Sequence, residues 1–126
     1  MPRLRVALAQ VDLTVGDLAG NADVIVEQAR AATQAGAALV AFPEMALTGY
    51  PPEDLVLRRS FVAASREALE RLAERLADEG LGDIAVVVGY LDRCANAAPR
   101  VGRPAGEPQN AAAFLHHGEV IARYAK

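Results

Sequence analysis

Three short and almost uninterrupted apolar segments constrain the fold of this chain more than any other feature. They occupy residues 4–11, 37–42 and 84–90, and such runs are typical of strands that are covered on both faces. Two stretches with helical periodicity separate them, at about residues 22–35 and 60–79. Helices that join consecutive strands are typical of a parallel or mixed sheet with helical crossovers. The order β-α-β-α-β therefore predicts an α/β fold.

Local signals indicate where the two helices begin and end. Asn21 is a candidate N-cap for the first helix, and Gly36 is a candidate stop signal. Gly80 and Gly82 would end the second helix. The spacing predicts that the buried face of this second helix consists of Phe61, Ser65, Leu69, Leu72 and Leu76.

The last third of the chain predicts a connecting loop followed by a β-hairpin. Residues 93–110 are rich in proline and glycine, and residues 111–116 and 119–126 flank a two-residue turn, His117-Gly118. Alternation places Val120, Ala122, Tyr124 and Lys126 on one face, which we expect to point inward. Lysine is rarely buried without a partner, so Lys126 is either a functional side chain or simply the last residue of the chain.

Composition narrows the classes of protein. Of the 126 residues, 52% are hydrophobic and 23% are charged, which is typical of one globular domain or part of one. A net charge of −3 and scattered basic residues argue against a nucleic-acid partner, and the apolar runs are too short for a membrane helix. The single cysteine excludes an internal disulfide framework, so we expect a cytoplasmic protein. Neither a metal-ligand pattern nor a glycine-rich phosphate loop is present, and we expect this segment to bind no metal or cofactor itself.

Glu44 is the first candidate for chemistry. It follows a buried strand directly, at the sheet edge where open α/β folds usually build their sites. A carboxylate there is costly to bury unless it is paired or used. Position alone leaves two interpretations open: a general base, or a carboxylate solvated by the loop that follows.

The sequence around this glutamate carries a family resemblance. Phe42-Pro43-Glu44, followed by Thr48-Gly49-Tyr50, resembles the signature around the catalytic glutamate of the nitrilase (carbon-nitrogen hydrolase) superfamily. The segments 15–21 and 48–55 most resemble the glutaminase domain of glutamine-dependent NAD⁺ synthetases, and residues 118–126 resemble the hairpin that carries the family's lysine. The resemblance implies that residues 1–126 are part of a carbon-nitrogen hydrolase (glutaminase) domain, with no second domain. The implied fold is the N-terminal portion of an α-β-β-α sandwich.

The resemblance also implies roles for individual residues. Glu44 would be the general base, Lys126 would stabilise the oxyanion, and Tyr50 would line the glutamine pocket unless it only packs on the adjacent prolines. The family's nucleophilic cysteine lies downstream of the lysine, so Cys94, in another segment, does not match it and the chain alone is expected to be inactive. Asn110 also resembles a family position, and we expect it to make backbone hydrogen bonds.

The implied activity is the glutamine-hydrolysing part of an NAD⁺ synthetase. Glutamine would be the substrate, and the ammonia would pass to a separate C-terminal synthetase domain that amidates deamido-NAD⁺ with ATP and Mg²⁺, within a homo-oligomer. A stand-alone nitrilase-like amidase with another substrate is the nearest alternative, against which Pro51-Pro52-Glu53-Asp54-Leu55 argues. A non-catalytic interaction module is an alternative of a different class.

Overall fold

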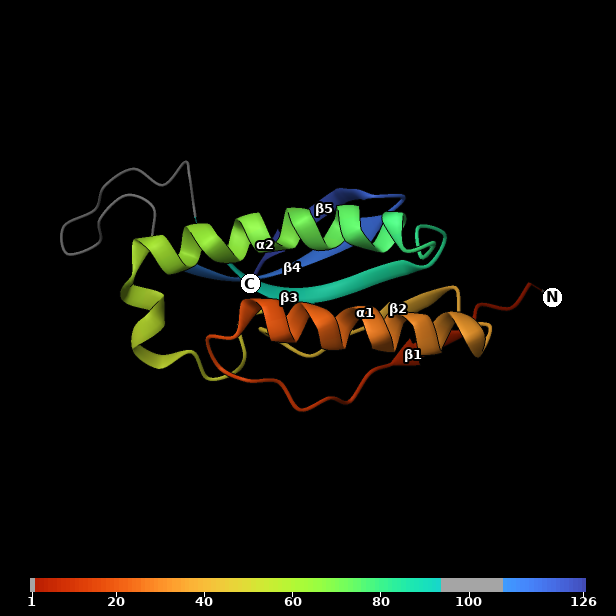
Figure 1. Ribbon diagram of the computed structural model, residues 1–126, viewed down its shortest axis with the longest axis horizontal. Coiled ribbons are helices and arrows are strands. Elements are labelled where there is room, and N and C mark those ends of the chain that lie inside the picture. Colours follow the sequence, from red (N-terminus) through yellow and green to blue (C-terminus); the bar gives the residue numbers. More distant parts are fainter. Residues whose placement is uncertain (1, 94–107) are drawn as a thin grey trace.

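The computed structural model describes residues 2–93 and 108–126, which form a mixed five-stranded sheet and two long helices (Figure 1). The strands lie in the order β1-β2-β3-β4-β5; the first three are parallel, and β4 and β5 are antiparallel to their neighbours. The strands are β1 (Val6–Leu8), β2 (Leu39–Ala41), β3 (Ala85–Arg93), β4 (Pro108–His116) and β5 (Glu119–Ala125). The helices are α1 (Leu18–Gln34), α2 (Arg59–Asp78) and a short 3₁₀ helix, η1 (Glu53–Leu57). The expected α/β fold with helical crossovers and a C-terminal hairpin is confirmed.

Both long helices cover the same face of the sheet (Figure 1). Ile25 of α1 and Leu69 of α2 are fully buried against the alternate residues Val40, Val86 and Val88 of the sheet. Burial of such apolar side chains removes their surface from water, which is the main favourable term in folding. None of the helices that the structure describes is both long and apolar enough to cross a membrane.

The opposite face of the sheet is apolar and open. Val6 is 46% exposed, Leu8 76% and Tyr124 74%. Within residues 2–93 and 108–126, the helices and the sheet therefore form one α layer and one β layer, which correspond to half of an α-β-β-α sandwich. Within these residues, β1 is a short edge strand that a helix covers on one side, so the expected cover on its second face stays a prediction.

Asn21 does not cap α1, as the sequence had suggested. Asp17 is the N-cap, and its side chain accepts a hydrogen bond from the Gly20 amide at 2.9 Å. Asn21 is buried, and its side-chain amide instead bonds the Thr14 amide and carbonyl (2.8 and 2.7 Å) and the Leu47 carbonyl (3.0 Å). It thereby joins the loop after β1 to the loop after β2, which contains Glu44.

The second helix buries the expected face with one change. Ser65, Leu69, Leu72 and Leu76 are buried, but Val62 is buried where Phe61 is only partly so. The expected loop over 93–110 is too long at its described ends, since Arg93 and Pro108 already pair as strand residues. Residues 94–107, including Cys94, lie outside the part of the chain that the structure describes.

The predicted two-residue turn at the hairpin is confirmed. His117 (φ 52°) and Gly118 (φ 79°) both have positive φ, as the favoured hairpin turn requires. A β-bulge follows, because Val120 pairs with Leu115 while Ala122 pairs with Phe114. The bulge interrupts the alternation, so Val120 packs toward the helices whereas Tyr124 and Lys126 lie on the open face. The expected common inward face is therefore wrong.

Candidate active site

The chain makes a sharp elbow at Glu44, immediately after β2. Phe42 donates a backbone hydrogen bond to Val87 (2.8 Å), and Leu47 donates one to Gly89 (3.0 Å), so the elbow remains attached to β3. Met45 has a φ of 51°, which is uncommon for a residue other than glycine. The elbow lies so close to β3 that a Cβ at Gly89 would sit 2.4 Å from the Met45 nitrogen. The absence of a side chain at this position lets the glutamate sit over the sheet.

Two further side chains converge on Glu44. Asn110, at the start of β4, donates a hydrogen bond from its side-chain amide to Oε1 of Glu44. Lys126, directly after β5, donates from Nζ to the same oxygen at 3.1 Å. The Lys126 amide also bonds the Asn110 carbonyl at 2.9 Å, which fixes the end of the hairpin beside β4. The fold thus brings Glu44 and Lys126 into contact although they are far apart in the chain.

These contacts set the charge state of the glutamate. The Asn110 hydrogen bond, and then the hydrogen bond and positive charge of Lys126, lower the pKa of Glu44 below its ordinary value of 4.5, while partial burial opposes them weakly. The group is therefore a carboxylate at neutral pH. The described contacts of this carboxylate all engage Oε1, which leaves Oε2 as the oxygen that can accept a proton.

A cleft of about 220 Å³ opens beside these groups on the open face of the sheet. Its walls are largely apolar, with Phe42, Val87 and Tyr124 among them, and its polar groups are Glu44, Asn110 and Lys126. An apolar cleft with a few convergent polar groups is the usual form of a small-molecule site. The Lys126 side chain is 77% exposed and that of Glu44 45%, so the described residues line one side of the cleft only.

A larger cleft, about 320 Å³, lies between α1 and α2 and contains none of these groups. Its charged residues pair with one another: Arg71 with Glu67 at 3.0 Å, and Arg75 with Asp23 at 2.5 Å. Paired charges on solvated helix faces explain this cleft without a ligand. We therefore place the candidate site at Glu44, although its cleft is the smaller one.

The other residues considered in the sequence, Tyr50, His116 and His117, are not part of the lining of this cleft. Tyr50 is 65% exposed and is not among the residues that line the cleft. His116 and His117 lie at the hairpin turn, where His116 contacts the Asp83 carbonyl at 3.2 Å. In the ranges 2–93 and 108–126, no group of three or more His, Cys, Asp or Glu side chains could hold a metal ion.

The side-chain role of Asn110 is the main feature that sequence reasoning missed. The expectation was backbone bonding, and the backbone carbonyl does accept from Lys126, but the side-chain amide binds Glu44. One signal could have revealed this role: a polar residue immediately precedes the apolar run 111–115, and that run begins next to the candidate lysine once the hairpin closes.

Comparison with known proteins places these residues in a family. The model of the carbon-nitrogen hydrolase family matches residues 5–126. The glutamine-dependent NAD(+) synthetase of Thermotoga maritima is 39% identical over 126 residues, which cover 100% of this chain and 19% of that protein. The enzyme of the same description from Xanthomonas campestris is 40% identical over 124 residues, which cover 98% of this chain and 20% of that protein. The chain thus spans about a fifth of the length of the curated relatives it matches.

Solved structures give the same result. A glutamine-dependent NAD(+) synthetase from Cytophaga hutchinsonii superposes with a TM-score of 0.79 at 25% identity, over 98% of this chain and 19% of that one. An amidase from Nesterenkonia sp. superposes with a TM-score of 0.72 at 29% identity, over 98% of this chain and 42% of that one. Together with the Phe42-Pro43-Glu44 signature and the lysine-bearing hairpin, these matches show that the chain belongs to the carbon-nitrogen hydrolase family of the nitrilase superfamily.

Proposed function

We propose that this chain is the N-terminal part of the glutamine-hydrolysing domain of a glutamine-dependent NAD⁺ synthetase. The observation that carries the proposal is the convergence of Lys126 and Asn110 on one oxygen of Glu44. Three polar groups from separate segments meet at the cleft, with the second carboxylate oxygen left for proton transfer. The relatives from Thermotoga maritima and Xanthomonas campestris are described as glutamine-dependent NAD(+) synthetases, which supports glutamine as the substrate and NAD⁺ formation as the overall reaction.

In the proposed reaction, the thiol of a cysteine other than Cys94, from the segment that follows the lysine in this family, attacks the amide carbon of glutamine. Oε2 of Glu44 accepts the thiol proton as the S–C bond forms, and Lys126 supplies fixed positive charge for the oxyanion. The C–N bond then breaks, and Glu44 returns the proton to the leaving ammonia. Water hydrolyses the resulting thioester to glutamate and regenerates the thiol. A solved structure of the Nesterenkonia amidase is described with acrylamide added to its active-site cysteine, which supports a thiol nucleophile in this fold.

Tyr50 retains its proposed role as a wall of the glutamine pocket. Its exposed ring follows Gly49 on the loop that leaves Glu44, so residues beyond those described could complete a pocket that includes it. Cys94 is not proposed as the nucleophile, because the family's cysteine belongs to a segment after the lysine.

The ammonia is proposed to pass to a C-terminal synthetase domain that amidates deamido-NAD⁺ with ATP and Mg²⁺. A similar synthetase from Acinetobacter baumannii has been solved in complex with ADP, which supports nucleotide use in those longer proteins. We propose no cofactor for residues 1–126 themselves, which form part of one hydrolase domain. A cytoplasmic homo-oligomer is the proposed setting.

The test measures glutamine hydrolysis and NAD⁺ formation by the full-length gene product, with either glutamine or ammonia as nitrogen donor. We expect Glu44→Gln and Lys126→Ala to abolish the glutamine-dependent reactions and to leave ammonia-dependent NAD⁺ formation intact. Glu67→Gln removes a surface carboxylate on α2 that is 64% exposed, between Glu44 (45%) and Lys126 (77%); it is the control and should change neither reaction.

Each other outcome points to a different function. Hydrolysis of another amide without NAD⁺ formation would make the protein a stand-alone amidase, an alternative supported less by the lower TM-score of the Nesterenkonia enzyme. A folded protein that hydrolyses no amide would be a non-catalytic interaction module. Glutamine hydrolysis that survives Glu44→Gln would refute the role of this carboxylate.

A further inference from the structure

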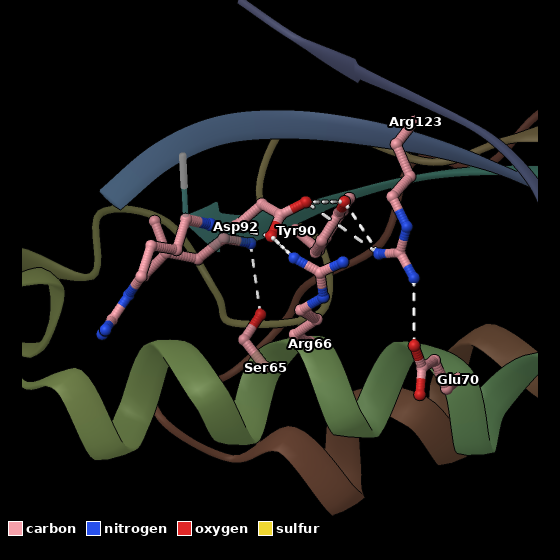
Figure 2. A network of polar contacts seen from close by, with 8 residues as sticks. Ser65, Arg66, Glu70, Tyr90, Asp92 and Arg123 are labelled. Atoms are coloured by element: carbon pink, nitrogen blue, oxygen red, sulfur yellow. Dashed lines mark hydrogen bonds and ion pairs between the residues drawn. The ribbon is translucent and has the colours of Figure 1, made fainter. Parts of the chain in front are cut away.

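A buried polar network lies on the helix-covered side of the sheet, behind the cleft (Figure 2). Tyr90 and Asp92 of β3 are 0% and 8% exposed, and the Tyr90 hydroxyl donates to Oδ2 of Asp92. Arg66 of α2 donates to Oδ1 of Asp92 at 3.1 Å, and the Arg93 amide donates to the same oxygen at 2.7 Å. Asp92 is therefore held by α2 and β3 independently of β5.

Arg123 connects β5 to this network (Figure 2). Its Nη1 donates to the Tyr90 hydroxyl at 3.1 Å and lies 3.9 Å from Oδ2 of Asp92. Its Nη2 donates to Glu70 of α2 at 3.1 Å, and the guanidinium carbon lies 5.8 Å from the centre of the Tyr90 ring. The Arg123 side chain is only 27% exposed, although the strand that carries it is at the sheet edge.

The edge position of β5 makes such an anchor important for Lys126. An exposed ion pair contributes little stability, so the contact between Lys126 and Glu44 cannot hold the strand end by itself. Val120 packs against the core, but it precedes the bulge, and Ile121 and Tyr124 are exposed. Beyond the bulge, Arg123 is the described side chain that ties β5 to elements other than β4.

We propose that Arg123 is a positioning residue that anchors the end of β5 to β3 and α2 and thereby holds Lys126 at Glu44. The two side chains leave the strand on opposite faces, Arg123 toward the helices and Lys126 toward the cleft. Loss of the anchor leaves Asp92 paired with Arg66, so the loosening is confined to β5. The catalytic consequence rests on the proposed function, whereas the anchoring does not.

The test compares Arg123→Gln with Arg66→Gln in the full-length gene product. Both remove one arginine from the same aspartate, but Arg66 belongs to α2, and its described hydrogen bond goes to β3 rather than β5. Hydrogen exchange of residues 119–126 is the first readout. We expect the Lys126 amide, bonded to Asn110, to exchange on the order of tenfold faster in Arg123→Gln, because a charge-assisted contact that opposes local opening is lost. We expect no such change in Arg66→Gln.

The second readout is glutamine hydrolysis over a range of pH. We expect kcat/KM to fall about 10- to 100-fold in Arg123→Gln, because a catalytic group is displaced. The acidic limb should move to higher pH, because Glu44 loses the Lys126 donor that helps to lower its pKa. Tyr124 and Lys126 are the other titratable groups that line the described cleft. Arg123→Lys should recover part of the activity, since lysine keeps the charge but not the two-pronged geometry.

Three outcomes decide the proposal. Equal exchange and equal kcat/KM in Arg123→Gln and Arg66→Gln would overturn it. If Arg123→Gln does not fold, Arg123→Met, which keeps the length of the side chain but removes its charge, carries the same comparison, and wild-type exchange and activity in that variant would overturn the proposal too. If the wild-type protein hydrolyses no glutamine, the proposed function fails, while faster exchange at Lys126 in Arg123→Gln alone still supports the anchor.

Discussion

A single methyl group added at Gly89 should displace the backbone at Glu44, the candidate base, without changing the chemistry of its side chain. In the Gly89→Ala variant, the new Cβ would lie 2.4 Å from the Met45 nitrogen, 2.7 Å from the Pro43 carbonyl oxygen and 2.9 Å from the Glu44 carbonyl carbon. All three atoms belong to the backbone, so no rotamer change relieves the contact. An ordinary contact begins near 3.4 Å, and the elbow must therefore move by about 1 Å relative to β3.

That movement has two measurable consequences. Overpacking of this kind costs typically about 1–3 kcal/mol of unfolding free energy. Misplacement of a catalytic group by about 1 Å can lower the rate by about 100-fold. We therefore expect Gly89→Ala to reduce kcat/KM for glutamine by roughly two orders of magnitude, and to lower the urea midpoint moderately.

The matched control is Gly80→Ala, at the end of α2. Gly80 has a φ of 78° and no heavy atom within 4 Å of an added Cβ, so alanine there costs about 1–2 kcal/mol of backbone strain and meets no neighbour. It should lower stability comparably and leave kcat/KM unchanged. A Gly89→Ala enzyme with kcat/KM within about twofold of wild type would refute the argument that the elbow's approach to β3 places Glu44.

Three further predictions concern polar groups. Asn110→Ala removes the largest cause of the lowered pKa of Glu44, so the acidic limb of the pH–rate profile should move to higher pH. Because that folded-state pKa lies below 4.5, the stability it contributes is present above pH 4.5 and is lost as pH falls through the folded value; acid titration of Asn110→Ala should show a smaller loss. Burial raises the pKa of Tyr90 to about 12, so unfolding free energy should fall between pH 10 and pH 12, with a smaller fall in Tyr90→Phe measured by denaturant titration. Asn21→Ala should cost about 1–3 kcal/mol in urea unfolding, because it leaves buried backbone groups of two loops without partners; a change below about 0.5 kcal/mol would contradict this role.

Much of the fold could be predicted because the relevant signals are local. The apolar runs, the helical periodicity and the His117-Gly118 turn each depend on residues that are close in the chain, and each appears in the structure. The errors share one cause. Asn21 has the side chain of a helix cap, but a buried loop–loop contact competes for its amide, and Asp17 takes the cap. The bulge beyond Val120 likewise depends on pairing with β4, which no pattern within β5 alone records.

In the candidate site, two residues could be recognised as candidates from the sequence: Glu44 at the end of a buried strand, and Lys126 at the end of a hairpin. The contact between these two residues, the hydrogen bond from Asn110 and the position of Tyr50 outside the cleft lining emerge from the folded chain. The same holds for the space that Gly89 leaves for the elbow and for the contacts of Arg123 with β3 and α2. Residue type and spacing set local conformation, whereas a contact between distant segments depends on the order of the strands in the sheet and on which side of each strand faces the cleft.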